Sequence, residues 1–269
     1  MPHLFLIFAM LLAAGLHGQL PTVAEFEQQY LFEDPPTPGC HASTIEELAD
    51  GTLLAAWFGG TREGAKDVGI YASRREGENW SRPRQLVVPV VQDGDTLPCW
   101  NPVLFRSQRD RLYLFYKVGP NPREWFGARL ISDDGGHTWS EPAYLPAGFL
   151  GPIRSKPTET EPGVILCGSS TESPATDDWR VHLERFREAT GSWQMVDVPN
   201  PKHLDIIQPT FLQHGGDTLQ ILCRSKHNRL VESWSYDGGG NWTPADSLNI
   251  LNPNAGADAV TLSGHHSGG

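Results

Sequence analysis

One short turn motif recurs along the chain, and it constrains the fold more than any other feature. The clearest copy, residues 132–139, has the form Ser-x-Asp-x-Gly-x-Thr-Trp. A second copy at residues 235–242 has Asn in place of Thr, and a weaker copy at residues 73–80 has Arg in place of Asp. Residues 189–193 keep only the end of the pattern. The terminal Trp residues recur at intervals of about 50–60 residues, which is typical of one propeller blade.

The residues around each motif predict β-hairpins. The motifs follow short alternating or apolar segments and precede Ser-x-Pro or Thr-Pro. Within the turn, the Asp can accept hydrogen bonds from backbone N–H groups, the glycines allow positive φ, and the Trp can pack between sheets. Calcium binding is the weaker alternative, because each turn offers at most two carboxylates.

Further strands are expected between the motifs, at residues 52–58, 111–116, 163–167 and 218–223. The order of strand, turn, strand and Asp-containing turn recurs four times. A β-sandwich would also contain many short strands, but it would not give a Trp-ended turn at this period. The sequence therefore predicts an all-β propeller of four-stranded blades.

Composition narrows the classes of partner. The 269 residues include 28 Gly and 22 Pro, so long helices are not expected. The net charge is −11, and the Lys and Arg residues are scattered. Because nucleic acid and anionic membranes require a basic surface, both are excluded as partners. An anionic substrate would need a local cluster of positive charge.

The N-terminus predicts export. Residues 4–16 form an apolar run that is shorter than the roughly 20 residues needed to span a bilayer. We interpret residues 1–18 as a signal peptide and residues 19–269 as the mature domain, secreted or periplasmic, with a membrane-tethered N-terminus as the alternative. No second apolar run follows, so the mature domain is expected to lack a membrane span and to be a monomer.

The four cysteines do not predict a metal or redox site. Cys40, Cys99, Cys167 and Cys223 are far apart and contain no Cys-x-x-Cys pair. We expect buried free thiols. Export would permit a disulfide, but the spacing does not choose the partners.

The motif copies resemble the Asp-box repeats of the sialidase (neuraminidase) superfamily, and the resemblance covers residues 38–262. It is closest to the divergent sialidase-like branch with BNR repeats, through segments at residues 57–64, 100–103, 151–157, 208–210 and 252–258. The resemblance implies a six-bladed propeller with no cofactor or metal, acting on a sialoglycoconjugate or another acidic glycan. Four motif-bearing units are visible, and the pattern would continue beyond Gly269, so we expect a C-terminally truncated domain of four to five blades.

The superfamily binds the sugar carboxylate with three arginines, uses an Asp as acid and base, and uses a Tyr activated by a Glu as nucleophile. By this resemblance, Arg224 is one carboxylate-binding arginine, since a guanidinium can form two parallel hydrogen bonds with a carboxylate. Arg62 and Asp67 correspond to an arginine and the acid. The alternative is an exposed ion-paired Arg224 and a solvated charged loop at residues 61–67.

Two expected features differ from the family pattern. His41 stands where the family has its first arginine, so it would be a weaker cation or a hydrogen-bond donor. Gln208 replaces the Glu that activates the Tyr, and an amide cannot accept that proton. A tyrosinate mechanism would therefore need another base.

A third group of residues suits a different acidic sugar. Arg154, Lys156 and Glu172 lie at comparable blade positions and supply two cations and a carboxylate, although each could equally be a surface residue. Three hypotheses follow: an exo-α-sialidase-like hydrolase with Asp67 as acid, a hydrolase or lyase for uronic-acid polysaccharides using Glu172 or Asp67, and a noncatalytic glycan-binding propeller.

Overall fold

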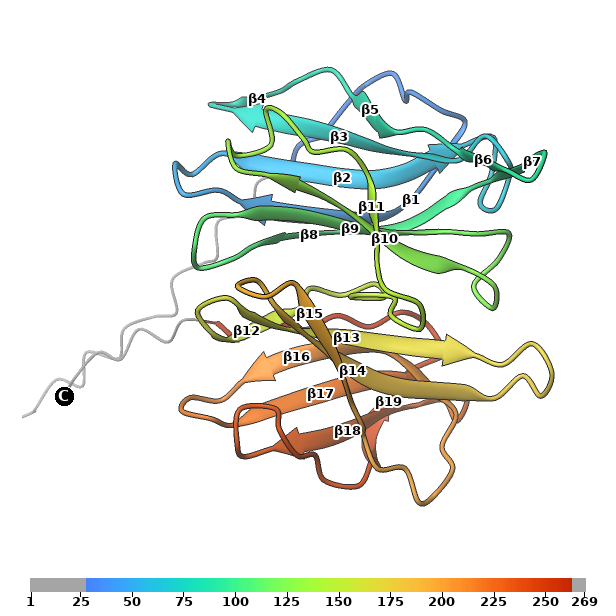
Figure 1. Ribbon diagram of the computed structural model, residues 1–269, viewed down its shortest axis with the longest axis vertical. Coiled ribbons are helices and arrows are strands. Elements are labelled where there is room, and N and C mark those ends of the chain that lie inside the picture. The colour runs from blue at the N-terminus through green and yellow to red at the C-terminus, as the bar shows by residue number, and fades with distance from the viewer. Residues whose placement is uncertain (1–27, 263–269) are drawn as a thin grey trace, which may run out of the picture. The chain divides into compact units, whose positions relative to one another are not determined.

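Four antiparallel sheets contain most of the regular structure of residues 28–262, the part of the chain that the computed structural model describes. These residues contain no helix, as the many Gly and Pro residues predict. The sheets follow one another along the chain, and each joins its strands in sequence order (Figure 1). Residues 31–262 lie within one compact unit.

The strands of the first sheet are β1 (Gly39–Glu47), β2 (Leu53–Gly60), β3 (Gly69–Glu76), β4 (Asn79–Trp80) and β5 (Arg84–Val87), with β4 and β5 both paired to β3. A separate hairpin contains β6 (Val90–Gln92) and β7 (Asp95–Leu97). The second sheet contains β8 (Cys99–Arg106), β9 (Leu112–Val118), β10 (Phe126–Ser132) and β11 (Ala143–Tyr144). The third contains β12 (Thr158–Glu161), β13 (Val164–Glu172), β14 (Trp179–Arg187) and β15 (Ser192–Val196). The fourth contains β16 (Ile206–Gln213), β17 (Leu219–Ser225), β18 (Arg229–Ser235) and β19 (Asp246–Leu251).

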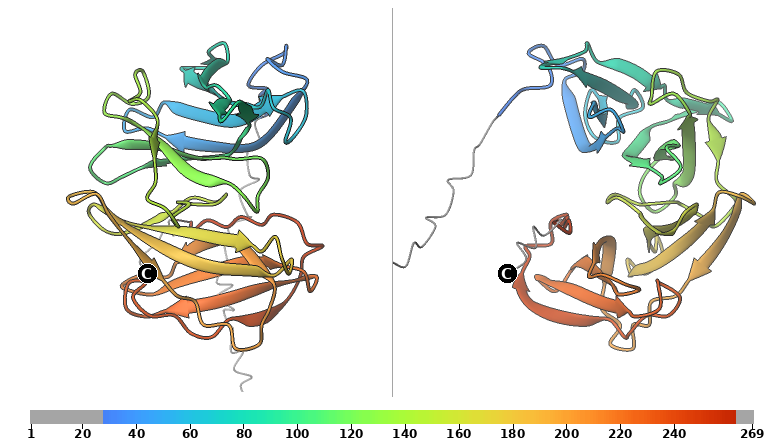
Figure 2. Two further views of the ribbon diagram at one scale, coloured as in Figure 1. Left: turned by 45° about the vertical axis from the view of Figure 1, so that its right-hand side comes forward. Right: turned by 90° about the vertical axis from the view of Figure 1, so that its left-hand side faces the viewer.

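The sheets stand side by side around an arc, with the first strand of each sheet on the inner side (Figure 2). Contacts between first strands agree with this arrangement. The amide of Leu104 in β8 donates to the Thr44 hydroxyl in β1 at 3.2 Å, and Gln213 in β16 donates to Thr158 in β12. The predicted propeller is confirmed, with four blades in the described part of the chain.

The core consists of apolar layers between neighbouring sheets, and β9 shows how the sequence builds them. Leu112, Leu114 and Tyr116 pack against the first sheet. Tyr113 and Phe115, which alternate with them, pack against the third sheet. Because successive side chains of a strand point to opposite faces, a strand between two sheets is apolar along its whole length.

The Asp-containing turns have the predicted structural role. Asp134 accepts hydrogen bonds from the backbone of Thr138 at 2.9 Å and from its hydroxyl at 2.5 Å. The Ser132 hydroxyl donates to Asp134 and accepts the amide of Gly136. Gly136 has φ +86°, and a Cβ there would lie 3.1 Å from Leu54 in the preceding sheet. The turn thus closes on itself and brings its glycine against the neighbouring blade.

The second complete turn repeats this packing. A Cβ on Gly239 (φ +83°) would lie 2.6 Å from Leu166 of the third sheet. Trp242 is buried in the core between the third and fourth sheets. Trp139 of the first complete turn and Trp80 of the weaker copy are only half-buried.

The cysteines correct one prediction. Cys99, Cys167 and Cys223 are buried free thiols, as expected, but Cys40 is exposed at the start of β1.

The strand predicted at residues 163–167 is longer in the structure, where β13 runs from Val164 to Glu172. The predicted signal peptide lies outside the described residues. Between residues 28 and 262, no helix has the length and hydropathy needed to cross a membrane.

The Asp motif should make the protein sensitive to acid. Hydrogen bonds from Asn241 and Ser235 lower the pKa of Asp237 to about 2 from its usual value of 3.8. Because the unfolded chain binds the proton more readily, this stabilisation is complete above about pH 4 and is lost as the pH falls toward 2. We expect the melting temperature of Asp237→Asn to fall less between these pH values than that of the wild type, measured by circular dichroism. Asp93→Asn, in the exposed β6–β7 turn, is the control and should follow the wild type.

Candidate functional site

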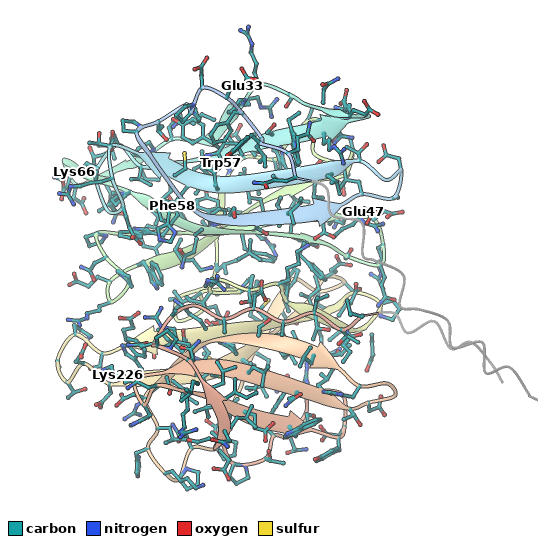
Figure 3. The ribbon with its side chains drawn as sticks, turned by 180° about the vertical axis from the view of Figure 1, so that it is seen from behind. Glu33, Glu47, Trp57, Phe58, Lys66 and Lys226 are labelled. Atoms are coloured by element: carbon teal, nitrogen blue, oxygen red, sulfur yellow. The ribbon has the colours of Figure 1, made fainter. Side chains whose placement is uncertain are left out.

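The loops between the second and third strands of the sheets lie at one end of the blades. In an antiparallel sheet this end is opposite the third-to-fourth hairpin, where the Asp motifs are found. Figure 3 shows Lys66 and Lys226, from two of these loops, at the same end of the molecule, with Glu47 at the other end. The first strands also begin at this end.

A half-buried cluster forms at this end around Arg224, next to the last residue of β17. Its Nε donates to Asn254 Oδ1 at 2.9 Å, and one terminal nitrogen donates to Gln208 Oε1 at 3.4 Å. The guanidinium lies 5.0 Å from the centre of the Trp179 ring. Burial lowers the pKa of Arg224 from its usual value, but an arginine remains charged at neutral pH. We call Arg154, Glu172, Trp179, Gln208, Arg224 and Asn254 the Arg224 cluster.

Arg154 and Glu172 bring the charges of the third sheet to this cluster. Arg154 donates to the carbonyl of Ala257 at 3.1 Å, in the segment that also carries Asn254. Arg154 is close enough to Arg224 to lower the pKa of Arg224, whereas Glu172 raises it. The charges of Arg154 and Glu172 thus both act on Arg224, and most N–H donors of the two guanidinium groups have no partner among the described contacts.

Glu172 is the last residue of β13 and is half-buried. Burial raises its pKa above the usual value, while the positive charges of Arg123 and Arg224 lower it. It borders a cavity of about 230 Å³ that Arg123, Trp125 and Phe149 also line. No ion pair joins Glu172 to Arg224 among the contacts of residues 28–262, although the charge of Arg224 influences the carboxyl group.

Backbone irregularities orient the polar side chains of the first strands. The pairing of β16 shifts register between Ile207 and Thr210, and Gln208 in this bulge has φ +57°. The equivalent bulge of β8 contains Asn101 with φ +38°, whose side chain donates to the Ile153 carbonyl. Bulges and unusual φ values are frequent beside functional sites because they redirect single side chains. Here they turn an amide toward Arg224 and another toward the segment that precedes Arg154.

Ion pairs connect the loops of three sheets around the cluster. Asp177, in the β13–β14 loop, forms ion pairs with Arg123 of the second sheet and with Lys226 of the fourth, the latter at 3.0 Å. Lys226 also lies 4.8 Å from the centre of the Trp179 ring, on which Arg224 is placed as well. Asp177 therefore joins three loops that are distant in sequence.

Asp67 and His41 make local contacts in the first sheet. Asp67 is exposed and accepts the backbone amide of Thr61 at 3.0 Å and the Thr61 hydroxyl at 2.5 Å. These bonds lower its pKa, so the carboxyl group is ionised at neutral pH and is poorly suited to donate a proton. His41 lies 3.7 Å from Glu63 and stacks on Phe58.

The structure thus brings together four of the predicted site residues, Arg154, Glu172, Gln208 and Arg224, while Asp67 and His41 make their contacts elsewhere. Arg62 is exposed in the same loop as Asp67. Lys156 forms an ion pair with Glu46 on β1. The functional roles of all these residues stay predictions.

Three members of the site were not singled out from the sequence. Asn254 lies in a segment that supported the family resemblance, but nothing in the sequence showed that this segment returns to Arg224. Trp179 and Asp177 follow no motif. Their signal is only that an aromatic residue and an acidic residue adjoin a second-to-third strand loop, which is common in propellers.

The residues present do not form a metal centre. In the described part of the chain, no three His, Cys, Asp or Glu side chains lie close enough to hold a metal ion. The polar groups of the cluster are mainly cationic donors, which suit an anion rather than a cation.

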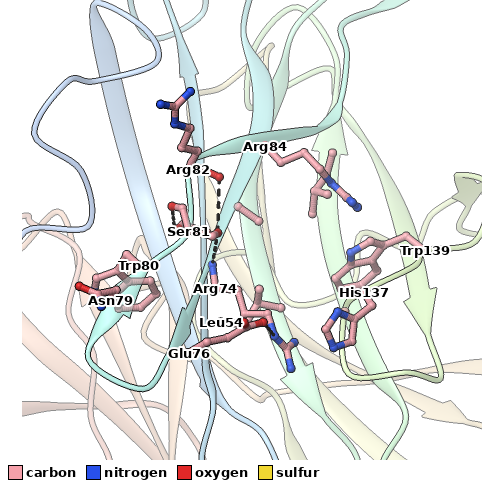
Figure 4. A pocket seen from close by; sticks show the side chains of 14 residues that line it. Leu54, Arg74, Glu76, Asn79, Trp80, Ser81, Arg82, Arg84, His137 and Trp139 are labelled. Carbon is pink, nitrogen blue, oxygen red and sulfur yellow. Dashed lines mark hydrogen bonds and ion pairs between the residues drawn. The ribbon is translucent and has the colours of Figure 1, made fainter.

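A separate cleft of about 520 Å³ lies where the first Trp-ended turn approaches the Asp motif of the second sheet (Figure 4). Arg74, Arg84, His137 and Trp139 are among its lining residues. The guanidinium of Arg74 is already engaged by the Gly135 carbonyl and by Glu76. Arg82 and Arg84 also line this cleft, which lies at the Asp-motif end of the sheets, away from the Arg224 cluster.

A family profile identifies the family of this chain. The profile of the BNR repeat-like domain matches residues 51–267, most of the chain. The chain belongs to this family. A search of curated proteins finds no match.

Solved structures show that this BNR repeat-like chain has the fold of the sialidase propellers. The NanB sialidase K499G mutant of Streptococcus pneumoniae aligns with a TM-score of 0.70 at 10% identity, over 88% of this chain and 56% of that chain. A Dyadobacter fermentans protein of unknown function aligns with a TM-score of 0.65 at 14% identity, over 79% and 70%. The Trypanosoma rangeli sialidase in complex with sialic acid gives 0.60 at 13% identity, over 77% and 37%. This chain thus spans little more than half the length of the pneumococcal enzyme, and the likeness establishes the fold alone.

The electrostatics of the cluster give a direct prediction for Glu172. Because Arg224 lowers the pKa of Glu172, replacing Arg224 with Met should raise that pKa further. Carboxyl titration of Glu172 by carbon NMR measures the change. Replacement of Arg187, an exposed arginine at the far end of β14, is the matched control and should leave the Glu172 titration unchanged. An unchanged pKa in Arg224→Met would show that the two groups do not interact.

Proposed function

We propose that the chain acts on glycans as a hydrolase that removes a terminal acidic sugar, with sialic acid as the first candidate. The observation that carries the proposal is the half-buried Arg224, held by Asn254 and Gln208, whose charge is influenced by Arg154 and by the half-buried Glu172. Guanidinium groups bind carboxylates with strong, directional hydrogen bonds, and partial burial strengthens them. The sialidase fold of the chain and the sialic acid complex of the Trypanosoma rangeli structure support this choice of ligand.

The carboxylate of the sugar would lie between Arg224 and Arg154. Arg224 is held by Asn254 and Gln208, so its orientation is fixed before the ligand binds. Gln208 stands where the family has a Glu, and its carbonyl oxygen accepts a hydrogen bond from Arg224. In this proposal Gln208 orients the arginine and takes no part in proton transfer.

Glu172 would supply the acid. Burial favours its protonated form, in contrast to the exposed Asp67. It would give its proton to the glycosidic oxygen as the bond to the anomeric carbon breaks. Water then adds to that carbon and returns a proton to Glu172, so atoms and charge balance. We therefore propose Glu172 as the general acid in place of Asp67.

A hydrolase or lyase for uronic-acid polysaccharides is the second candidate. Uronic acids carry the same carboxylate, and Arg154 and Glu172 on the third sheet could serve them equally. Fluorogenic α-sialoside and β-glucuronide substrates separate the first candidate from a uronic-acid hydrolase. A lyase would instead produce an unsaturated uronate that absorbs in the ultraviolet. A noncatalytic propeller would bind an acidic glycan and turn over none of them.

Substitution of Glu172 tests its role. We expect Glu172→Gln to reduce turnover by about 10²-fold or more with little change in affinity, because the amide keeps the shape but cannot donate the proton. Asp67→Asn is the matched carboxylate control and should retain most activity. The reverse ranking of these two variants would restore Asp67 as the acid.

Substitution of Arg224 tests carboxylate binding. Arg224→Met should weaken binding of the acidic sugar by about 2 kcal/mol, the usual value for losing charged hydrogen bonds. A neutral analogue without the carboxylate should bind wild type and variant alike. Equal losses for the acidic and neutral sugars would contradict a carboxylate-binding role.

Export is part of the same proposal, because glycoconjugates with terminal acidic sugars lie largely outside the cell. It rests on the apolar run at residues 4–16. N-terminal sequencing of the protein recovered from the extracellular or periplasmic fraction tests whether cleavage follows residue 18.

A further inference from the structure

A buried pair of opposite charges lies between the second and third sheets. Lys117 on β9 and Glu184 on β14 are the only charged side chains with no exposed surface between residues 28 and 262. Their charges interact, and burial lowers the pKa of Lys117 to about 7 while Glu184 opposes that change. No direct ion pair joins Lys117 to Glu184 among the described contacts, and the Glu184 carboxylate instead contacts His182 Nε2 at 2.9 Å. Burying a charged group is costly unless it is hydrogen-bonded, so each of the two groups needs bonding partners of its own.

Both members of the pair are bonded to one short backbone segment. The Glu184 carboxylate accepts the amides of Leu150 at 3.0 Å and Gly151 at 2.7 Å. The Lys117 ammonium donates to the carbonyl of Pro152. The carboxylate thus accepts two backbone N–H groups and the ammonium donates to a backbone C=O within three residues, which apolar side chains could not do.

The rest of this segment is equally constrained. The amide of Ile153 donates to the Gly168 carbonyl at 2.9 Å, and the Ile153 carbonyl accepts from Asn101 at 3.1 Å. A Cβ on Gly127 would lie 2.8 Å from the Leu150 carbonyl, so the segment sits directly on β10. Each of the residues 150–153, immediately before Arg154, thus has at least one backbone group in a hydrogen bond.

We infer that Lys117 and Glu184 are positioning residues that set the place of Arg154, and through it the affinity of the Arg224 cluster for a sugar carboxylate. The effect on carboxylate affinity rests on the proposed function. The fixing of residues 150–153 by the two buried groups does not depend on it. Directional bonds from buried groups are an effective way to hold a binding residue within a narrow range of positions.

Hydrogen exchange tests whether Lys117 and Glu184 fix residues 150–153, and it requires no ligand. In Lys117→Met and in Glu184→Gln, amide exchange in a peptide spanning residues 149–154 should be about tenfold faster or more. The matched control is Tyr113→Phe, which removes another buried bond between the same two sheets, from the Tyr113 hydroxyl to Glu188 at 2.8 Å. Unchanged exchange in both charge variants, or the same increase in Tyr113→Phe, would overturn the inference.

A double-mutant cycle tests the consequence for binding. With methyl α-N-acetylneuraminate or methyl β-glucuronide as the probe, Lys117→Met should weaken binding about tenfold in the wild-type background. It should have almost no effect when Arg154 is already Ala, because Lys117 acts through that residue. An equal loss in both backgrounds would contradict the inference.

Failure of the proposed function would look different. If the wild type binds neither probe, the proposed function fails, and the exchange measurement alone decides whether the charge pair fixes the segment. If Lys117→Met does not fold, Glu184→Gln and the double variant Lys117→Met/Glu184→Gln, which removes both charges, take its place in both experiments.

Discussion

The contact between each Asp-containing turn and the preceding sheet is the interaction on which the rest of the structure depends. The carboxylate of Asp134 or Asp237 holds its turn closed, and the glycine of the turn then meets a leucine of the neighbouring blade. A side chain at Gly239 would overlap Leu166. This close approach sets the spacing of the sheets, and the apolar layers between them are filled by strands such as β9 that are buried on both faces.

Stacking the sheets in this way gathers loops that are distant in sequence. All second-to-third strand loops emerge at the end opposite the Asp motifs, so charges from separate blades meet there. Asp177 joins Arg123 and Lys226 across three blades, and Trp179 supports both Arg224 and Lys226. The structural motif turns therefore lie at one end of the blades and the proposed binding site lies at the other.

The blade pattern could be predicted because it is local. An Asp, two glycines and a Trp within eight residues specify a turn through bonds inside the turn itself, and the strands around it show their apolar character directly. Arg224 was predicted as a carboxylate-binding residue through the resemblance to the sialidase superfamily, and that role stays a prediction. Glu172 could not be ranked against Asp67 in this way, because the proton affinity of Glu172 depends on burial and on the charges of Arg123 and Arg224 from other blades.

The sequence by itself determined the all-β propeller, the place of each motif turn and the set of charged residues near strand ends, since all of these follow from contacts over a few residues. Only the tertiary structure decided which charges meet. It placed Arg154 and Glu172 beside Arg224, left Asp67 in its own loop, and buried Lys117 with Glu184 under the segment that carries Arg154. The reason is physical: the environment of a charge is set by side chains from other sheets, and their approach depends on how the blades stack.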